Sequence, residues 1–150
     1  TWEVNHHKYI FLTKNPERMY YKIRNVKPAC LSHAYFGTSV DGSLPGKTRL
    51  KDLKLIHDLG FKTVISFEPL LCDPSELIRE TGGIDWADWI IVGGQTNPVK
   101  LPDVSWISRI SANFRTGGAF FVKGNADPNH IWNQQFPADL LPIAQAWGKA

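Results

Sequence analysis

The chain has 150 residues, of which 43% are hydrophobic and 21% are charged, as is ordinary for one folded domain. Its net charge of +3 is too weak to indicate strong nucleic-acid binding, and no apolar run approaches the roughly 18–20 residues of a membrane span. Cys30 and Cys72 are far apart in the sequence and form no Cys-x-x-Cys pattern, so neither a disulfide framework nor a zinc site is expected. Without a charged-then-apolar leader, the expected location is the cytoplasm.

Five short apolar segments, each ending in polar residues, predict five β-strands. They are YIFLTK (9–14), AYFGTSVD (34–41), KTVISFEP (62–69), WIIVGGQ (89–95) and AFFVKGN (119–125). Short buried strands that alternate with stretches of helical length are typical of βα units and a parallel sheet. The carboxyl ends of such strands meet at one edge, where ligands bind in α/β proteins. The pattern therefore predicts one functional edge.

Helical periodicity and capping residues predict helices between these strands and one short helix near the end of the chain. Three of the predicted helices cover about 16–25, 47–59 and 142–148. Of the other two, one follows the capping residues 73–76 and ends at Gly82, and one begins after residue 103 and ends before Gly117. The fold class is α/β, with five parallel βα units forming part of a (β/α) barrel and an open doubly wound sheet as the alternative. Residues 1–150 are expected to form a single α/β domain. Because a strand begins so near Thr1, we expect the domain to be the C-terminal part of a larger barrel.

Glu68 and Lys123 are the candidate catalytic residues. A carboxylate that ends an apolar strand is costly to bury without a partner, and Lys14 and Lys123 end two other strands. Glu68 would orient a ligand amine or hydroxyl, act as a base, or form a structural pair with a lysine. These alternatives remain open from the residues alone.

The candidate binding residues follow the other strand ends. Glycines at 93 and 94 let a phosphate, carboxylate or cofactor approach the backbone amides, although a tight turn also explains them. Gln95 adds a neutral hydrogen-bonding group. Ser39 would bond a ribose or substrate, while the neighbouring Asp41 favours an Asx turn.

A basic stretch follows the first predicted strand. Lys14 and Arg18 lie near enough to the strand end to bind an anion, whereas Lys22 and Arg24 are typical of a solvated helix face. The histidines are too scattered to form a metal site, so no metal ligands are predicted.

Five stretches together resemble the phage Gp37/Gp68 family, also called DUF5131. They are FLTKNPERM (11–19), YFGTSVDG (35–42), ISFEPLLCDP (65–74), IDWADWIIVGGQTNP (84–98) and AFFVKGN (119–125). That family resembles radical S-adenosylmethionine enzymes, with a partial (β/α) barrel and a three-cysteine pattern suited to a [4Fe–4S] cluster. By position, the resemblance carries over to Lys14, Arg18, Ser39, Glu68, Gly93, Gly94 and Lys123.

The sequence departs from this family in three places. The cysteine-bearing region is absent, Gln95 replaces a glutamate, and Asn125 replaces an aromatic-glycine ending. Because three thiolates hold such a cluster, the chain alone is expected to carry no cofactor. S-adenosylmethionine and [4Fe–4S] are expected only for a full-length member of the family.

These observations lead to three hypotheses for the function. The chain is the C-terminal part of a radical S-adenosylmethionine-like barrel without its iron-sulfur motif, a non-catalytic phosphate- or nucleotide-binding module, or an inactive fragment. The expected partners are a small molecule or nucleotide, and either a second copy or a missing N-terminal half that covers the sheet edge. A nucleic acid partner stays open, and no membrane partner is expected.

Overall fold

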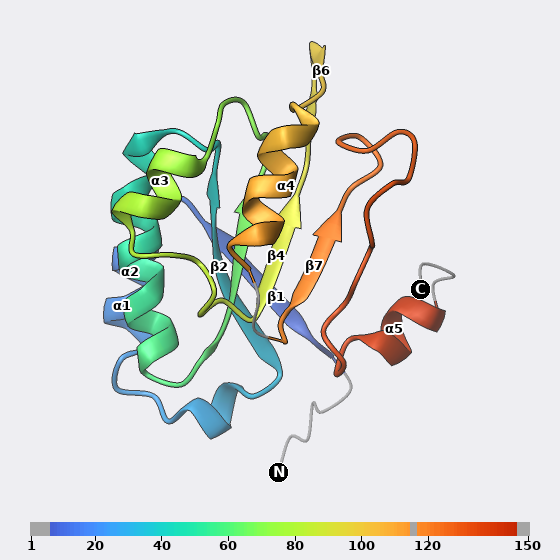
Figure 1. Cartoon of the computed structure of the whole chain (residues 1–150). Coiled ribbons are helices and arrows are strands. Elements are labelled where there is room, and N and C mark those ends of the chain that lie inside the picture. The colour runs from blue at the N-terminus through green and yellow to red at the C-terminus, as the bar shows by residue number, and fades with distance from the viewer. Residues whose placement is uncertain (1–6, 115–116, 147–150) are drawn as a thin grey trace.

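A computed structural model describes residues 7–114 and 117–146. Its centre is a parallel five-stranded sheet with the order β1-β2-β3-β4-β7 (Figure 1). These strands are β1 (Tyr9–Thr13), β2 (Ala34–Val40), β3 (Lys62–Phe67), β4 (Trp89–Val92) and β7 (Ala119–Val122). The α/β prediction with five parallel strands is confirmed.

The strands alternate with helices at nearly the predicted positions. The helices are α1 (Pro16–Ile23), α2 (Lys47–Asp58), α3 (Ser75–Glu80), α4 (Val104–Ala112) and α5 (Leu141–Ala146), with short 3-10 turns at Pro28–Leu31 and Leu44–Gly46. The helices α1 to α4 each stop before their predicted ends. Residues 115–116 and 147–148 of the predicted helices lie outside the described residues. Within the described ranges, no helix has the length and apolar character needed to cross a membrane.

A small hairpin follows the fourth strand of the sheet. The sheet strand β4 ends at Val92, and Gln95 begins a separate antiparallel hairpin made of β5 (Gln95–Thr96) and β6 (Val99–Lys100). The hairpin projects from the carboxyl end of the sheet, where β6 is the uppermost element in Figure 1. The end of β4 before the two glycines agrees with the prediction, whereas the hairpin that begins at Gln95 was not predicted.

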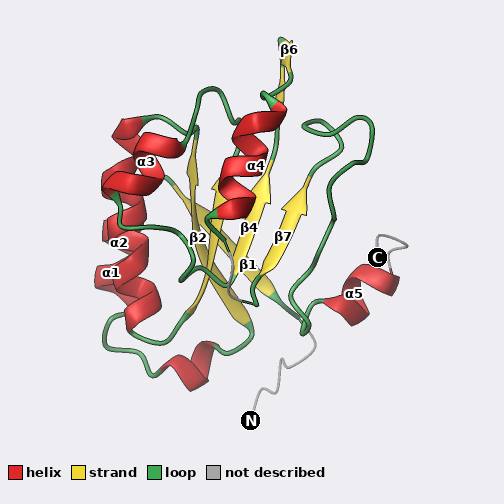
Figure 2. Ribbon diagram, in the orientation of Figure 1, coloured by secondary structure: helices red, strands yellow, loops and turns green. Residues whose placement is uncertain are grey.

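The strands follow one another in sequence order across the sheet, without a reversal. A doubly wound sheet needs such a reversal, because its helices must cover both faces. Here the buried residues of α2, α3 and α4 all pack in one cluster with Phe36, Ile65, Phe67, Ile90 and Val92 of the sheet. These three helices therefore cover the same face of the sheet (Figure 2), whereas the helices of a doubly wound sheet cover both faces.

The opposite face, here called the inner face, has its own smaller core. Tyr35, Val64, Trp89, Ile91 and Ala119 form this core, and Leu140 from the C-terminal segment packs against them. Because side chains alternate along a strand, the residues at the carboxyl ends of β2, β3 and β7 that share this face are Ser39, Ser66, Glu68 and Lys123. The fold thus brings polar residues to one end of the inner face.

Strand β1 forms one edge of the sheet and is incompletely covered. Tyr9, Ile10, Phe11 and Leu12 are 40–49% exposed, although strands of parallel sheets are normally buried on both faces. An edge of this kind offers unpaired backbone groups and apolar side chains to another strand.

We expect the chain to self-associate through β1. Sedimentation velocity should show a concentration-dependent dimer, and Ile10→Lys should shift the distribution to the monomer because a charge at this edge opposes strand pairing. Leu55→Lys, at a similarly exposed apolar residue on α2, should leave the dimer intact. A monomer at every concentration would contradict this expectation.

Candidate functional site

Glu68 and Lys123 form a bidentate ion pair at the carboxyl end of the sheet. The Lys123 Nζ lies 2.8 Å from Oε1 and 2.7 Å from Oε2 of Glu68. Glu68 directly follows β3 and Lys123 directly follows β7, while β4 lies between these strands. The pair therefore spans the end of a neighbouring strand.

Gly93 leaves the space in which this pair forms. A Cβ atom at position 93 would lie 2.7 Å from Oε1 and 2.8 Å from Cδ of Glu68. Because real Cβ atoms essentially never come so close to another heavy atom, any side chain here would displace the carboxylate. The glycine after β4 thus leaves room for the Glu68 carboxylate in its present position.

The structure selects one of the two lysines proposed as partners of Glu68. Lys14 follows β1, which is two strands from β3 on the side away from β7, so roughly 10 Å of sheet separates the two strands. Lys14 is exposed and forms no ion pair with any residue in the described ranges. Arg18, on the first turn of α1, is also exposed and lies on this distant side.

The Glu68–Lys123 pair remains open to solvent. The side chain of Glu68 is 30% exposed and that of Lys123 is 42% exposed. Ser39 is half-buried and pairs in register with Ser66 of β3, two residues before Glu68. Ser66 is buried at 1% exposure, so of these two hydroxyls only that of Ser39 adds to the accessible polar surface beside the pair. Sequence reasoning missed Ser66, although alternation along VISFEP would have placed it on the same face as Glu68.

The backbone amides of the two glycines after β4 already donate hydrogen bonds within the protein. The Gly93 N–H donates to the Phe67 carbonyl at 3.0 Å, and the Gly94 N–H donates to Oδ1 of Asn125 at 3.3 Å. The Asn125 Nδ2 in turn donates to the Gly94 carbonyl at 3.0 Å. A Cβ at position 94 would lie 2.3 Å from the Asn125 carbonyl oxygen. These glycines allow close packing of two loops, and Asn125 is a site-forming residue that sequence reasoning treated only as a departure.

The remaining predicted residues have local roles. Gln95 lies in β5, where its Nε2 donates to the Asn97 carbonyl at 3.3 Å, and it is half-buried. The Ser39 carbonyl accepts a bond from Arg49. The Asx turn at Asp41 is confirmed, since its Oδ1 accepts from the Ser43 N–H at 2.9 Å. The Ser43 side-chain hydrogen bond is the main factor that lowers the Asp41 pKa below its ordinary value.

The residues present do not fit an iron-sulfur cluster. Such a cluster needs three thiolates, and the chain has two cysteines. Cys30 is exposed in the 3-10 turn that precedes β2, whereas Cys72 is half-buried in the loop after β3, so they lie at opposite ends of the sheet. Within residues 7–114 and 117–146, no three His, Cys, Asp or Glu side chains gather as a metal site would require.

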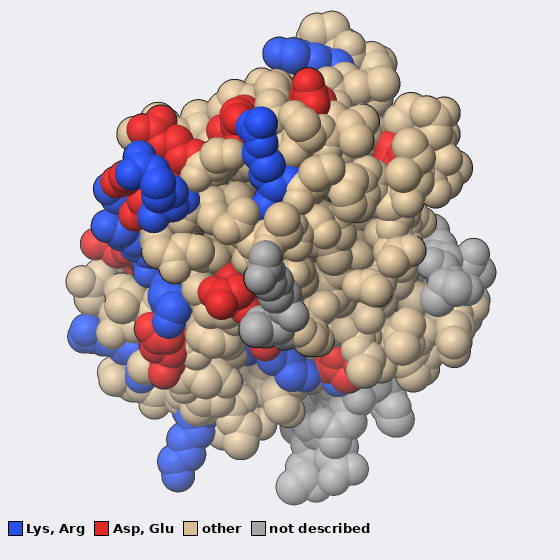
Figure 3. All heavy atoms as spheres, in the orientation of Figure 1, with Lys and Arg blue, Asp and Glu red and all other residues tan. Residues whose placement is uncertain are grey.

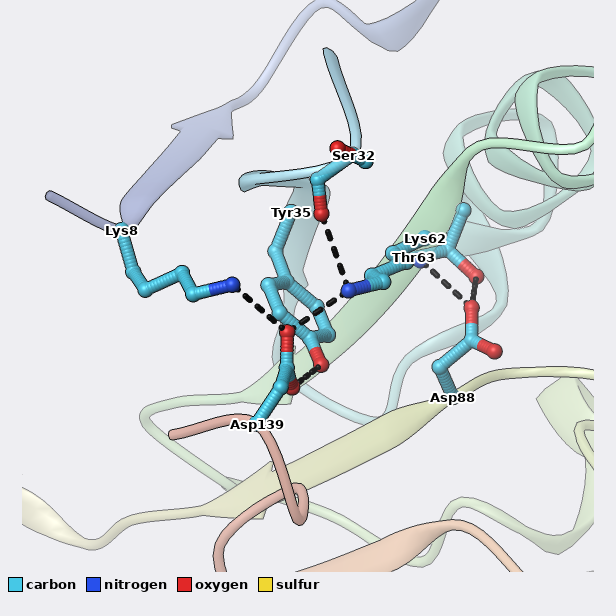
Figure 4. A network of polar contacts seen from close by, with 7 residues as sticks. All are labelled: Lys8, Ser32, Tyr35, Lys62, Thr63, Asp88 and Asp139. Carbon is cyan, nitrogen blue, oxygen red and sulfur yellow. Dashed lines mark hydrogen bonds and ion pairs between the residues drawn. The ribbon is translucent and has the colours of Figure 1, made fainter. Parts of the chain in front are cut away.

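A second polar network lies at the amino end of the inner face (Figure 4). Asp139 accepts bonds from Lys62 at 2.6 Å, from the Tyr35 hydroxyl at 2.7 Å and from Lys8 at 3.2 Å. Burial opposes ionisation of Asp139, but the bonds from Lys62, Tyr35 and Lys8 outweigh it and lower its pKa to about 2. Burial, and then the Asp139 bond, raises the pKa of Tyr35. This network fastens the C-terminal segment to the sheet.

The fold and the site define a parallel α/β protein in which the Glu68–Lys123 pair lies at the carboxyl edge of the inner face. The chain belongs to the family described as "Protein of unknown function (DUF5131)", whose model matches residues 1–134. No curated protein and no solved structure matches the chain. The family resemblance expected from the sequence is thus confirmed at the level of DUF5131.

Proposed function

We propose that this chain is the ligand-binding part of a Gp37/Gp68-type (β/α) barrel, in which Glu68 and Lys123 receive the charged end of a small polar ligand. The observation that carries the proposal is the solvent-accessible, bidentate ion pair that spans Gly93 on the inner face. Ligands of parallel α/β proteins bind at this edge of the sheet. The sequential strand order supports the barrel architecture.

The chemistry of the pair favours a ligand that carries an ammonium and a carboxylate close together. Glu68 would accept bonds from the ligand ammonium, and Lys123 would donate to the ligand carboxylate, so each protein charge keeps an opposite partner. The amino-acid end of S-adenosylmethionine has both groups. The resemblance to radical S-adenosylmethionine proteins points to the same molecule.

This chain alone would bind the ligand without cleaving it. An iron-sulfur cluster would supply the electron that cleaves S-adenosylmethionine in a complete radical enzyme, but the two cysteines here do not fit one. The residues of this chain would bind and orient the ligand. The alternative of a phosphate cradle at Gly93 and Gly94 has less support, because both amides already donate within the protein.

Isothermal titration with S-adenosylmethionine tests the proposal. We expect saturable binding to the wild-type chain and a loss of at least tenfold in affinity for Glu68→Gln and for Lys123→Met, since each change leaves one ligand charge unpaired. Gly93→Val should have the same effect by displacing the Glu68 carboxylate.

Lys47→Met is the matched control. Lys47 forms an ion pair of 2.9 Å with Glu80, both side chains are about one third exposed, and the pair joins α2 and α3 away from the site. This variant should bind as the wild type does. If the wild type binds no S-adenosylmethionine, or if all four variants bind equally, Glu68 and Lys123 form a structural pair and the proposal is wrong.

A further inference from the structure

The net positive charge of the chain is concentrated in one segment. Residues 14–27, here called the basic segment, hold five basic residues and one acidic residue, a local net charge of +4. The rest of the chain has 12 basic and 13 acidic residues, a net charge of −1. The weak overall charge therefore hides a strongly basic region over α1 and its flanks.

The five cations of the basic segment are exposed, and none forms an ion pair with a residue that the structure describes. They are Lys14, Arg18, Lys22, Arg24 and Lys27. Elsewhere on the helical face, cations lie beside acids (Figure 3), as in the pairs Lys47–Glu80, Lys54–Asp58 and Arg79–Glu80. The basic segment thus differs from the neighbouring helices in lacking internal neutralisation.

An exposed aromatic ring lies among these cations. Tyr21 is 56% exposed, and the Arg24 guanidinium lies over its ring at 4.9 Å from the centroid. Arg18 and Lys22 are one helical turn apart on α1, about 6 Å along its axis, and Tyr21 shares their exposed side. Cations that track a phosphate backbone, interleaved with a ring for base stacking, are the features of single-strand nucleic-acid surfaces.

We propose that the basic segment binds single-stranded nucleic acid, with Arg18 and Lys22 contacting phosphates and Tyr21 stacking on a base. The charge of the basic segment complements a polyanion. The Tyr21–Arg24 stack adds a flat π surface on which a nucleic-acid base can stack, and this favours a nucleic acid over an acidic polypeptide. This surface lies on the β1 side of the sheet, away from the Glu68–Lys123 pair near β7. It is therefore a second site, independent of the ligand proposed above.

Fluorescence anisotropy with labelled 12-nucleotide oligouridylate and oligothymidylate tests the proposal on the full chain. We expect dissociation constants in the micromolar range at 50 mM KCl. With two phosphate contacts, from Arg18 and Lys22, binding should weaken about sevenfold at 200 mM KCl. The variant Arg18→Glu/Lys22→Glu should lose at least tenfold in affinity and show a shallower salt dependence. Tyr21→Ala should lose about fivefold or more through lost stacking.

Lys51→Glu/Lys100→Glu is the matched control, because it changes the net charge equally at two exposed cations outside the basic segment. It should reduce affinity much less than the α1 variant. Circular dichroism melts of both double variants would first establish that they are folded. The proposal is overturned if neither oligonucleotide binds saturably at 50 mM KCl, or if both double variants lose affinity equally. Displacement of the oligonucleotide by polyglutamate at equal charge concentration would also overturn it, in favour of an acidic polypeptide.

Discussion

Gly37→Ala is expected to lower the free energy of unfolding by about 3 kcal/mol, at the upper end of the usual cost of overpacking a core. The Cβ of alanine would lie 2.4 Å from Cγ1 and 2.5 Å from the carbonyl oxygen of Val64, and 2.8 Å from Cδ2 of Leu12. Gly37 and Val64 are paired in register, so the carbonyl cannot retreat without opening the ladder between β2 and β3. For a chain of this length, thermal melting should fall by about 6–12 °C.

Gly124→Ala is the matched control for this loss. The nearest atom to a Cβ at position 124 is Cε1 of His130 at 3.8 Å, an ordinary contact. Its melting temperature should stay close to that of the wild type. A Gly37→Ala protein that melts within about 2 °C of the wild type would show that β2 and β3 can separate locally at low cost.

Asp139→Asn is expected to destabilise the chain by about 1–3 kcal/mol at neutral pH. The change removes the charge that accepts bonds from Lys8, Tyr35 and Lys62, and it leaves two ammonium groups without their anion. Lys62 still donates to the Ser32 carbonyl at 2.9 Å, so the loss is partial. Urea unfolding at pH 7 measures the difference.

The same carboxylate predicts a pH dependence with a definite sign. The pKa of Asp139 is lowered to about 2 in the folded chain, against an ordinary value of 3.8. The unfolded state therefore binds more protons between these values, and stability rises with pH there. The contribution of Asp139 is complete above about pH 4 and is lost as the pH falls toward 2. Urea midpoints at pH 2, 3, 4 and 5 should show this rise of stability with pH in the wild type and not in Asp139→Asn.

Asp58→Asn serves as the comparison for both measurements. Asp58 is about half exposed and pairs with Lys54 within one helix, where ion pairs contribute little. Its urea midpoint should follow the wild-type pH profile. If Asp139→Asn also follows that profile, another acid accounts for the loss of stability at low pH.

Local patterns predicted the elements because each depends on neighbours in the sequence. Apolar runs marked β1 to β4 and β7, and Asn15 followed by Pro16 marked the start of α1. The β5–β6 hairpin was missed because Gly93-Gly94-Gln95 was interpreted as a strand ending. In the structure the chain continues from these glycines into a second, antiparallel pair.

The candidate site was only partly predictable. A carboxylate after an apolar strand required a partner, which pointed to a lysine for Glu68. The choice of Lys123 over Lys14 depends on the strand order, which no local pattern contains. The role of Gly93 likewise appears only when the Glu68 side chain crosses β4. Asp139 and Tyr35 are far apart in sequence, so their hydrogen bond follows from tertiary packing alone.

The sequential strand order has a consequence for how the chain folds. Strands that are neighbours in the main sheet also follow one another along the sequence of that sheet's strands. Each βα unit can therefore add to the one before it without the earlier closure of a long loop. The contact between Lys8 and Asp139 is different, because it joins residues 131 positions apart. Once β7 has joined the sheet, only the segment between Val122 and Asp139 has still to be placed, and its docking forms the Asp139 bonds and buries Leu140. Because this segment packs on a sheet that is already assembled, we expect it to dock last and to open first. Hydrogen exchange around residues 136–140 should therefore precede exchange in the buried strands β2 and β3.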